Sequence, residues 1–231
     1  SAQHCNSEFF LGDPDGNFQN KHLAEMSPHT VLTGSTPRLL DEWQEVPPLW
    51  DAVRAEVDAR NAKGQFILTG SATPNRKGIL HSGAGRIGRL RMRPMSLFEA
   101  GSSSGSISLE NLCRGELSPT ITGEVELLKL AQYIVRGGWP GNLTVPEKQA
   151  GLMAAEYISA ILENDVYRLD GVKLNVHKMR LLLKSLARNE STTATNKTLK
   201  NDIKAVDAED VDDDTISTYL DVFRRLFLLD N

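Results

Sequence analysis

Two adjacent carboxylates stand directly after a short apolar run in the segment RLLDEWQEVP, residues 38–47. A carboxylate such as Asp41 can bind a hydrated magnesium ion, directly or through water. A second acid beside it, here Glu42, can accept a proton from an attacking water molecule. This order of residues is typical of enzymes that hydrolyse nucleotides. The competing interpretation is structural, with Asp41 capping the following turn and Glu42 exposed to solvent.

A second group of polar residues follows another apolar run. Thr69, Gly70 and Ser71 come directly after Phe-Ile-Leu, residues 66–68. Small polar residues of this kind suit a phosphate oxygen or a water molecule. Because ligands of α/β sheets bind beyond the carboxyl ends of the strands, we expect Thr69 and Ser71 to contact a nucleotide at the edge that carries the two acids.

A basic segment occupies residues 76–93 and contains no acid. Its cationic residues are Arg76, Lys77, Arg86, Arg89, Arg91 and Arg93. An arginine supplied by a neighbouring subunit can stabilise a phosphoryl group during transfer, and Arg86 is the candidate for that role. The same charges could instead contact a nucleic-acid backbone. A third interpretation is an alternating strand at GRLRMR, residues 88–93, whose arginines face solvent or pair with acids elsewhere.

Composition narrows the class of protein. The chain has 231 residues, of which 40% are hydrophobic and 24% charged, enough for one large domain or two smaller ones. A net charge of −4 gives no overall indication of a nucleic-acid or membrane partner. The two cysteines lack the spacing of a zinc site or a disulfide framework. This cysteine usage fits a reducing cytoplasm, which is the location we expect. No apolar run reaches the roughly 18 residues that a membrane span needs, so we expect no membrane contact.

The first part of the chain alternates between strand and helix patterns up to about residue 95. Short apolar runs predict strands at residues 8–11, 38–41, 65–70 and 89–92. Between the second and third of these, residues 47–64 carry apolar residues at helical spacing. This alternation predicts an α/β domain with a largely parallel sheet.

After a Gly/Ser-rich segment at residues 95–112 the pattern becomes helical. Apolar stripes at helical spacing begin at Leu127, Tyr157, Met179 and Ile216. We therefore predict an α/β part at residues 1–110 and a mainly helical part at residues 111–231, with the boundary near residues 105–120.

The last three predicted helices, at residues 177–189, 195–203 and 215–228, have the order of a helix-turn-helix. The acidic run DAEDVDDD, residues 207–214, precedes the last of them and should repel DNA phosphates. A winged-helix shape used for packing or protein contact is therefore favoured over DNA binding. Within the acidic run, the interpretation of Asp214 as the cap of the last helix is favoured over a calcium loop, because a turn-forming Gly is missing.

Several long segments together resemble one known family. They are RLLDEWQEVPPLWDAVRAEVD (38–58), GQFILTGSATP (64–74), GAGRIGRLRMRPMSLFEAG (83–101), RGGWPGN (136–142) and TISTYLDVFRRLFLLDN (215–231). The first three resemble the Walker B, sensor and arginine segments of prokaryotic AAA-like P-loop ATPases. The last two resemble the C-terminal domain of unknown function in that family, which contains a winged-helix-like unit.

The resemblance implies ATP and magnesium as cofactors and gives the polar residues specific roles. Asp41 corresponds to the acid associated with magnesium, and Glu42 to the base that polarises water. Ser71 corresponds to the sensor of the terminal phosphate, and Arg86 to an arginine that acts on a phosphate.

One motif of that family does not occur in the sequence. A P-loop ATPase of this type carries GxxxxGKS/T, whose backbone N–H groups and lysine hold the phosphates. The chain contains no Gly-Lys dipeptide. We expect the chain to be a fragment, with the P-loop lying before Ser1 and the C-terminal end cut short.

Without the P-loop we expect an incomplete P-loop NTPase-like sheet that does not hydrolyse ATP by itself. The alternative is a non-catalytic regulatory or DNA-binding module with a winged helix, so enzyme activity of this chain is left open. The expected partners are ATP in the complete protein and a second copy of the chain at an exposed sheet edge, with DNA the less favoured one.

Overall fold

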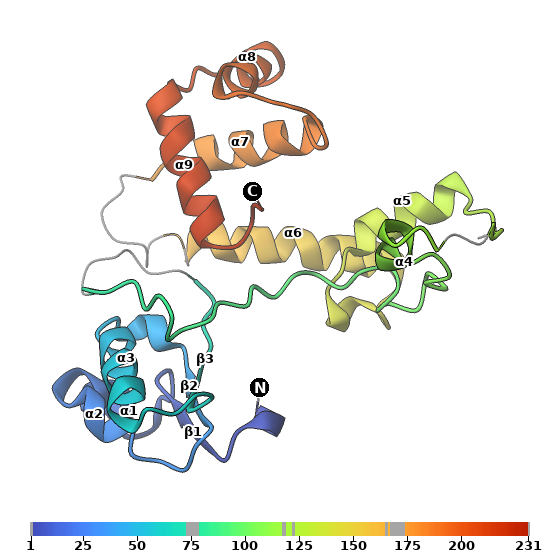
Figure 1. Ribbon diagram of the computed structural model, residues 1–231. Helices are drawn as coiled ribbons and strands as arrows, with labels where there is room; N and C mark the ends of the chain where they lie inside the picture. Colours follow the sequence, from blue (N-terminus) through green and yellow to red (C-terminus); the bar gives the residue numbers. More distant parts are fainter. Residues whose placement is uncertain are drawn as a thin grey trace. The chain divides into compact units, whose positions relative to one another are not determined.

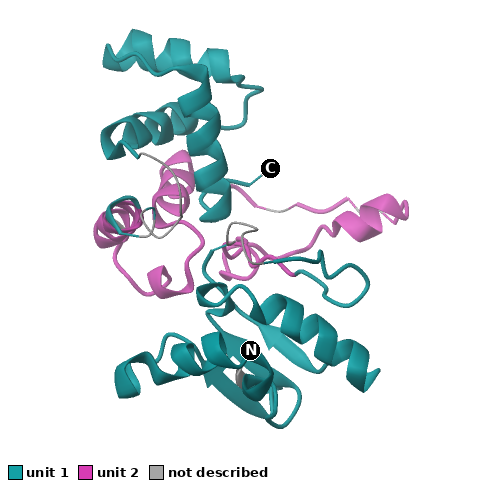
Figure 2. Ribbon diagram, turned by 90° about the vertical axis from the view of Figure 1, so that its left-hand side faces the viewer, with its two compact units in different colours: residues 1–89, 162–231 teal, residues 90–161 magenta. Residues whose placement is uncertain are grey.

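The computed structural model describes residues 2–72, 79–116, 119–121, 123–164, 166 and 174–230. The chain divides into two compact units, one formed by residues 1–89 and 162–231 and the other by residues 90–161 (Figure 2). Each part is described by itself below, with the helices and strands labelled as in Figure 1.

A three-stranded parallel sheet forms the centre of the N-terminal part (Figure 1). Its strands are β1 (Ser7–Phe10), β2 (Arg38–Asp41) and β3 (Phe66–Leu68), in the order β1-β2-β3. Phe10 pairs with Asp41 and Leu40 pairs with Leu68, so all three strands end at the same edge. The predicted α/β class with a parallel sheet is confirmed for this part.

Helices connect the strands, as parallel pairing requires. They are α1 (Asp15–Met26) and α2 (Pro28–Val31) between β1 and β2, and α3 (Leu49–Arg60) between β2 and β3; short 3-10 turns are η1 (Ala2–His4) and η2 (Trp43–Glu45). The three α-helices share one apolar core with β2, which includes Ala24, Val31, Leu40 and Val53. The helical spacing read at residues 47–64 is thus confirmed as the buried face of α3.

Three of the four predicted strands are confirmed, with slightly different ends. The fourth, at residues 89–92, is wrong, because no strand forms in the described range 79–116. Leu90 and Met92 are 93% and 89% exposed, so these alternating apolar side chains are not packed against other parts of the chain. A period-two pattern makes a strand only when a neighbouring strand accepts its backbone hydrogen bonds.

The unit formed by residues 90–161 is helical where it has regular structure. Its elements are α4 (Leu109–Cys113), α5 (Leu127–Arg136), η3 (Pro140–Asn142) and most of α6 (Glu147–Glu163). The Met95 amide donates to the Gly138 carbonyl at 2.7 Å, and a Cβ atom at position 138 would lie 2.6 Å from the Met95 carbonyl oxygen. Glycine is therefore required where these two backbone segments meet.

The C-terminal helices are α7 (Val176–Arg188), α8 (Asn196–Asp207) and α9 (Asp213–Arg225). They bury apolar side chains that include Met179, Leu182, Ile203, Ile216 and Phe223. Arg188 of α7 forms ion pairs with Asp202 at 2.7 Å and Asp207 at 3.0 Å on α8. The predicted helices are confirmed, whereas a winged helix stays a prediction, since no strand follows α9 among residues 226–230.

The cap of α9 differs from the sequence-based expectation. Asp212, rather than Asp214, accepts hydrogen bonds from the Thr215 amide and hydroxyl, both at 2.7 Å. These hydrogen bonds lower the pKa of the Asp212 carboxyl below its ordinary value. The expectation was wrong by two residues because the helix begins at Asp213, and consecutive aspartates make the N-cap ambiguous in the sequence.

Shortening a buried side chain of the central strand tests the shared core. Leu40 of β2 is fully buried, so Leu40→Ala should lower the free energy of opening of the sheet by about 2–5 kcal/mol. Native-state hydrogen exchange of the β2 amides measures that quantity. The matched control is Leu80→Ala, which removes the same atoms from a side chain that is 85% exposed and should change it by less than about 0.5 kcal/mol. Equal effects of the two variants would contradict this account of the core.

Candidate functional site

The polar residues expected to meet at the strand ends do so. The Thr69 hydroxyl donates to Asp41 Oδ1 at 2.5 Å, and the Ser71 hydroxyl donates to Glu42 Oε2 at 3.1 Å. Backbone hydrogen bonds continue the ladder past the strands, from the Thr69 amide to Leu40 at 3.0 Å and from the Trp43 amide to Thr69 at 3.1 Å. The β2–β3 register thus brings two acids and two hydroxyls together, while the roles assigned to them stay predictions.

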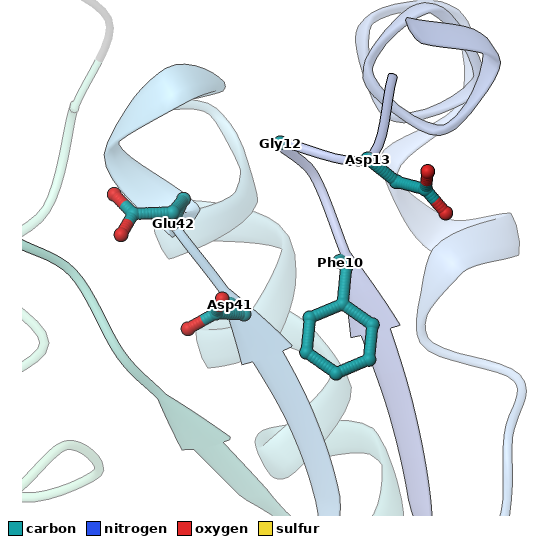
Figure 3. Close-up of a pocket in the computed structure, with 5 residues that line it drawn as sticks. All are labelled: Phe10, Gly12, Asp13, Asp41 and Glu42. Carbon is teal, nitrogen blue, oxygen red and sulfur yellow. The ribbon is translucent and has the colours of Figure 1, made fainter. Parts of the chain in front are cut away.

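Glu42 occupies an uncommon backbone conformation. Its φ of 56° and ψ of 40° lie in the left-handed region, which a non-glycine residue enters at a cost of order 1 kcal/mol. Figure 3 shows the Asp41 and Glu42 carboxylates on the same side of the strand end, toward β3. Because the chain turns sharply at Glu42, adjacent acids that would alternate along a strand face the same region.

Gln44 was missed by the sequence reasoning. Its side-chain nitrogen donates to Glu42 Oε2 and lies 3.4 Å from the Ser71 hydroxyl oxygen. A Cβ atom at position 70 would collide with the Gln44 amide oxygen, so Gly70 leaves the room that this side chain occupies. The sequence held one indication, since Gln44 lies two residues after Glu42 in a segment that must turn.

The strand ends line an open hollow of about 440 Å³ (Figure 3). Its lining residues are Phe10, Gly12, Asp13, Asp41 and Glu42. Phe10 is the last residue of β1, and Gly12 and Asp13 follow it; none of the three was predicted as a site residue. Asp13 points away from the other two acids in Figure 3, and it accepts a hydrogen bond from the Asp15 amide at 2.9 Å. The hollow is therefore acidic, and a phosphate would need a cation to enter it.

The oxygen ligands at the strand ends suit a magnesium ion that keeps its waters better than a metal ion bound entirely by protein side chains. Within the described residues, no three His, Cys, Asp or Glu side chains group closely enough to hold a metal ion. Magnesium usually keeps several waters and is bound by one or two carboxylates together with phosphate oxygens. Asp41, whose Oδ1 is already fixed by Thr69, meets that requirement.

Contacts around the site hold its backbone in place. Lys21 of α1 forms an ion pair with Glu45 of η2 at 2.8 Å, next to the turn that carries the acids. The Asn20 side chain donates to the Phe10 carbonyl at 3.0 Å. The rings of Trp43, the residue after Glu42, and Trp50 of α3 lie 5.1 Å apart. These contacts fix the turn against α1 and α3.

Arg86 is paired with Asp58 of α3 and is not among the residues that meet at the strand ends. Its guanidinium Nε donates to Asp58 Oδ1 at 2.9 Å, and both groups are exposed. This hydrogen bond lowers the pKa of Asp58 and raises the pKa of Arg86. Arg86 would have to leave Asp58 before it could act on a phosphate, and its role in a neighbouring site stays a prediction.

The segment that contains Arg86, residues 79–89, is bound to α3 by hydrogen bonds and a ring contact. Asp51 accepts hydrogen bonds from the Leu80 amide at 2.7 Å and from the His81 amide at 3.1 Å. The Trp50 indole donates to the His81 carbonyl at 3.0 Å, and the Arg89 guanidinium lies 5.2 Å from the Trp50 ring. Two of the basic residues are thus engaged with α3.

The Asp51 contacts should make this attachment sensitive to acid. Partial burial raises the pKa of Asp51, but hydrogen bonds from Leu80 and His81 outweigh it and leave the pKa below its ordinary value. The depressed pKa means that the stabilisation is complete above about pH 4 and is lost as pH falls through the lower pKa of the folded state. NMR should show the Leu80 and His81 amides titrating below about pH 4. In Asp51→Asn this step should be absent; a step that persists would assign it to another group.

None of the helices in the described part of the chain is long and apolar enough to span a membrane.

Two family models match the chain. Residues 10–101 match a model described as an AAA domain, and residues 127–231 match a domain of unknown function, DUF8612. No curated protein and no solved structure matches significantly. The first match supports a relation to AAA-like ATPases and, with it, the use of a nucleotide and magnesium in general. It covers β2, β3 and only the last residue of β1, together with both acids, Thr69, Ser71 and Arg86.

Proposed function

We propose that this AAA-related chain carries the magnesium-binding and water-activating half of an ATP site. The observation that carries the proposal is the pairing of two acids with two hydroxyls at the strand ends, Asp41 with Thr69 and Glu42 with Ser71. The AAA domain match over residues 10–101 supports it independently of the geometry.

Asp41 is the residue proposed to hold hydrated magnesium. Its Oδ1 accepts the Thr69 hydroxyl, so the orientation of the carboxylate is fixed and its second oxygen can accept from a metal-bound water. Magnesium, when bound, would neutralise phosphate charge at a hollow that is otherwise acidic.

Glu42 is the proposed general base. A carboxylate held by the Ser71 hydroxyl and the Gln44 amide keeps one orientation, which proton transfer from an attacking water requires. The Ser71 hydroxyl could turn from Glu42 to a phosphate oxygen, which is the behaviour expected of a sensor. Arg86 is proposed to act on the phosphate of a neighbouring copy after leaving Asp58.

ATP hydrolysis by this chain alone should be negligible. The sequence contains no GxxxxGKS/T motif, whose backbone N–H groups and lysine grip the phosphates. Phosphoryl transfer depends on positioning and charge neutralisation more than on the base. Within the described part of the chain, the residues that line the hollow at the strand ends supply acids but no cationic side chain.

The DNA-binding alternative receives no support from α9. The solvent-facing positions of this helix include Asp213, Asp214 and Asp221, and Arg224 is paired with Asp221 at 2.9 Å. An acidic helix face repels the phosphate backbone. We therefore do not propose DNA as a partner.

Manganese provides a direct test of the metal site, because it substitutes for magnesium and broadens nearby NMR signals. Titration with Mn²⁺ should broaden the amide signals of residues 41–42 and 69–71 first. Asp41→Asn should weaken this binding by about tenfold or more, since the metal loses a charged ligand.

The matched control is Asp51→Asn, which makes the same change of charge on α3 and should leave the broadening unchanged. Broadening that survives Asp41→Asn, or that centres on the acidic run at residues 207–214, would refute the proposed metal site.

Phosphate release tests the expected lack of turnover. With ATP and Mg²⁺, the chain should release phosphate no faster than its Glu42→Gln variant, because no phosphate-gripping loop is present to position the nucleotide. A coupled assay of inorganic phosphate measures both rates. Magnesium-dependent release that disappears in Glu42→Gln would contradict the expectation and establish hydrolysis by the chain itself.

A further inference from the structure

Phe10 ends β1 with an aromatic ring at the hollow (Figure 3). It pairs in register with Asp41 of β2, so the ring and that carboxylate lie on the same face of the sheet. The ring is 43% exposed, and no cation of the described residues lies over it. A hydrated magnesium ion gains little from such a ring, because its waters separate it from the ring face. The proposed metal site therefore does not explain why Phe10 lines the hollow.

The two acids beside the ring have no cationic partner in the described part of the chain. Thr69 donates to Asp41 Oδ1 and Ser71 donates to Glu42 Oε2, and both donors are neutral. The second oxygens, Asp41 Oδ2 and Glu42 Oε1, accept no hydrogen bond from the described residues. Two oriented negative charges therefore face a hollow of about 440 Å³, which gives room for a group of several heavy atoms.

Other phenylalanine rings of this sheet show which group such a ring can bind. The Arg38 guanidinium lies 5.5 Å from the ring centroid of Phe9, the residue before Phe10. Arg60 lies 5.2 Å from the ring centroid of Phe66 on β3. A guanidinium is planar and weakly hydrated, so it can stack on a ring while its N–H groups donate to a carboxylate. An ammonium group is compact and strongly hydrated, and it gains less from the ring.

We propose that the hollow at the strand ends is a binding site for a guanidinium group. The group stacks on the Phe10 ring and donates to the carboxylates of Asp41 and Glu42, which supply the charge-assisted hydrogen bonds. The approach beside the ring is open, since a Cβ atom at Gly12 would have no neighbour within 4 Å. A bound guanidinium excludes magnesium from Asp41. Only this regulatory consequence rests on the proposed function; the guanidinium site itself does not.

NMR titration of the full chain with ethylguanidinium chloride tests the site. The salt should shift the ring signals of Phe10 and the carboxyl carbon signals of Asp41 and Glu42. It should also give cross peaks between the ethyl protons and the Phe10 ring. Ethylammonium chloride at the same concentration is the control and should cause shifts that are several-fold smaller. Equal shifts with the two salts, or none with either, would overturn the inference.

Substitution separates the ring from the acids. Phe10→Leu keeps an apolar side chain but removes the ring, so it should weaken ethylguanidinium binding by about two- to fivefold. The matched control is Phe98→Leu, which removes a ring that is 63% exposed and does not line the hollow, and it should leave the affinity unchanged. Unchanged hydrogen exchange of the β2 amides would verify that the Phe10→Leu sheet is folded. An unchanged affinity in folded Phe10→Leu would contradict the stacking.

Two further measurements make the test independent of that variant. If Phe10→Leu does not fold, the cross peaks between the ethyl protons and Phe10 in the unsubstituted chain decide the question. Dilution of the chain without added salt identifies the source of the guanidinium. Phe10 ring signals that move with protein concentration would assign it to an arginine of a second copy, and constant signals would assign it to another molecule.

Competition with the metal separates this inference from the proposed function. Ethylguanidinium should reverse the Mn²⁺ broadening at residues 41–42, and broadening that persists at saturating ethylguanidinium would refute the regulatory consequence. Mn²⁺ broadening without any ethylguanidinium shift would refute the guanidinium site and leave the proposed function standing. Conversely, ethylguanidinium shifts in a chain that shows no Mn²⁺ site would refute the proposed function alone.

Discussion

The parallel register between β2 and β3 is the constraint on which the candidate site depends. Leu40 pairs with Leu68, so the residues that follow the two strands leave the sheet at the same level. Asp41 and Thr69 lie far apart in the sequence, and only this pairing joins them. A slip of one residue would turn every side chain of β3 to the opposite face and separate the hydroxyls from the acids. The buried core formed by β2 and the three N-terminal helices opposes such a slip.

Charge is distributed unevenly within this N-terminal part. The hollow at the strand ends carries acids, whereas Arg86 and Arg89 are held on α3 by Asp58 and Trp50. Hydroxyl and amide donors, rather than cations, hold the Asp41 and Glu42 carboxylates. Such donors orient a carboxylate while leaving its negative charge available to a hydrated metal ion or a proton. The geometry therefore suits the metal and water of a nucleotide site better than its phosphates.

The sequence predicted the features that depend on local residue patterns and on the order of the strands. The parallel sheet and the meeting of Asp41 with Thr69 follow from apolar runs that end in polar residues, since parallel strands end at one edge. The prediction of a strand at residues 89–92 was wrong. An alternating pattern indicates which side chains a strand would bury, but it does not show that a neighbouring strand is available for hydrogen bonding. Gln44 was missed because its contact depends on the left-handed turn at Glu42. No periodicity in the sequence encodes that turn.

Trp50 links two regions that otherwise have separate contacts. One side of its ring lies near Trp43, the neighbour of Glu42, and its indole nitrogen is bound to the His81 carbonyl. Lifting residues 79–89 from α3 would change the polarity around this indole and its packing on Trp43 at the same time. Indole emission depends on both, so the tryptophan pair is an intrinsic optical reporter of how residues 79–89 are seated on α3. One of the two tryptophans, Trp43, is adjacent in the sequence to Glu42, the acid proposed to activate water.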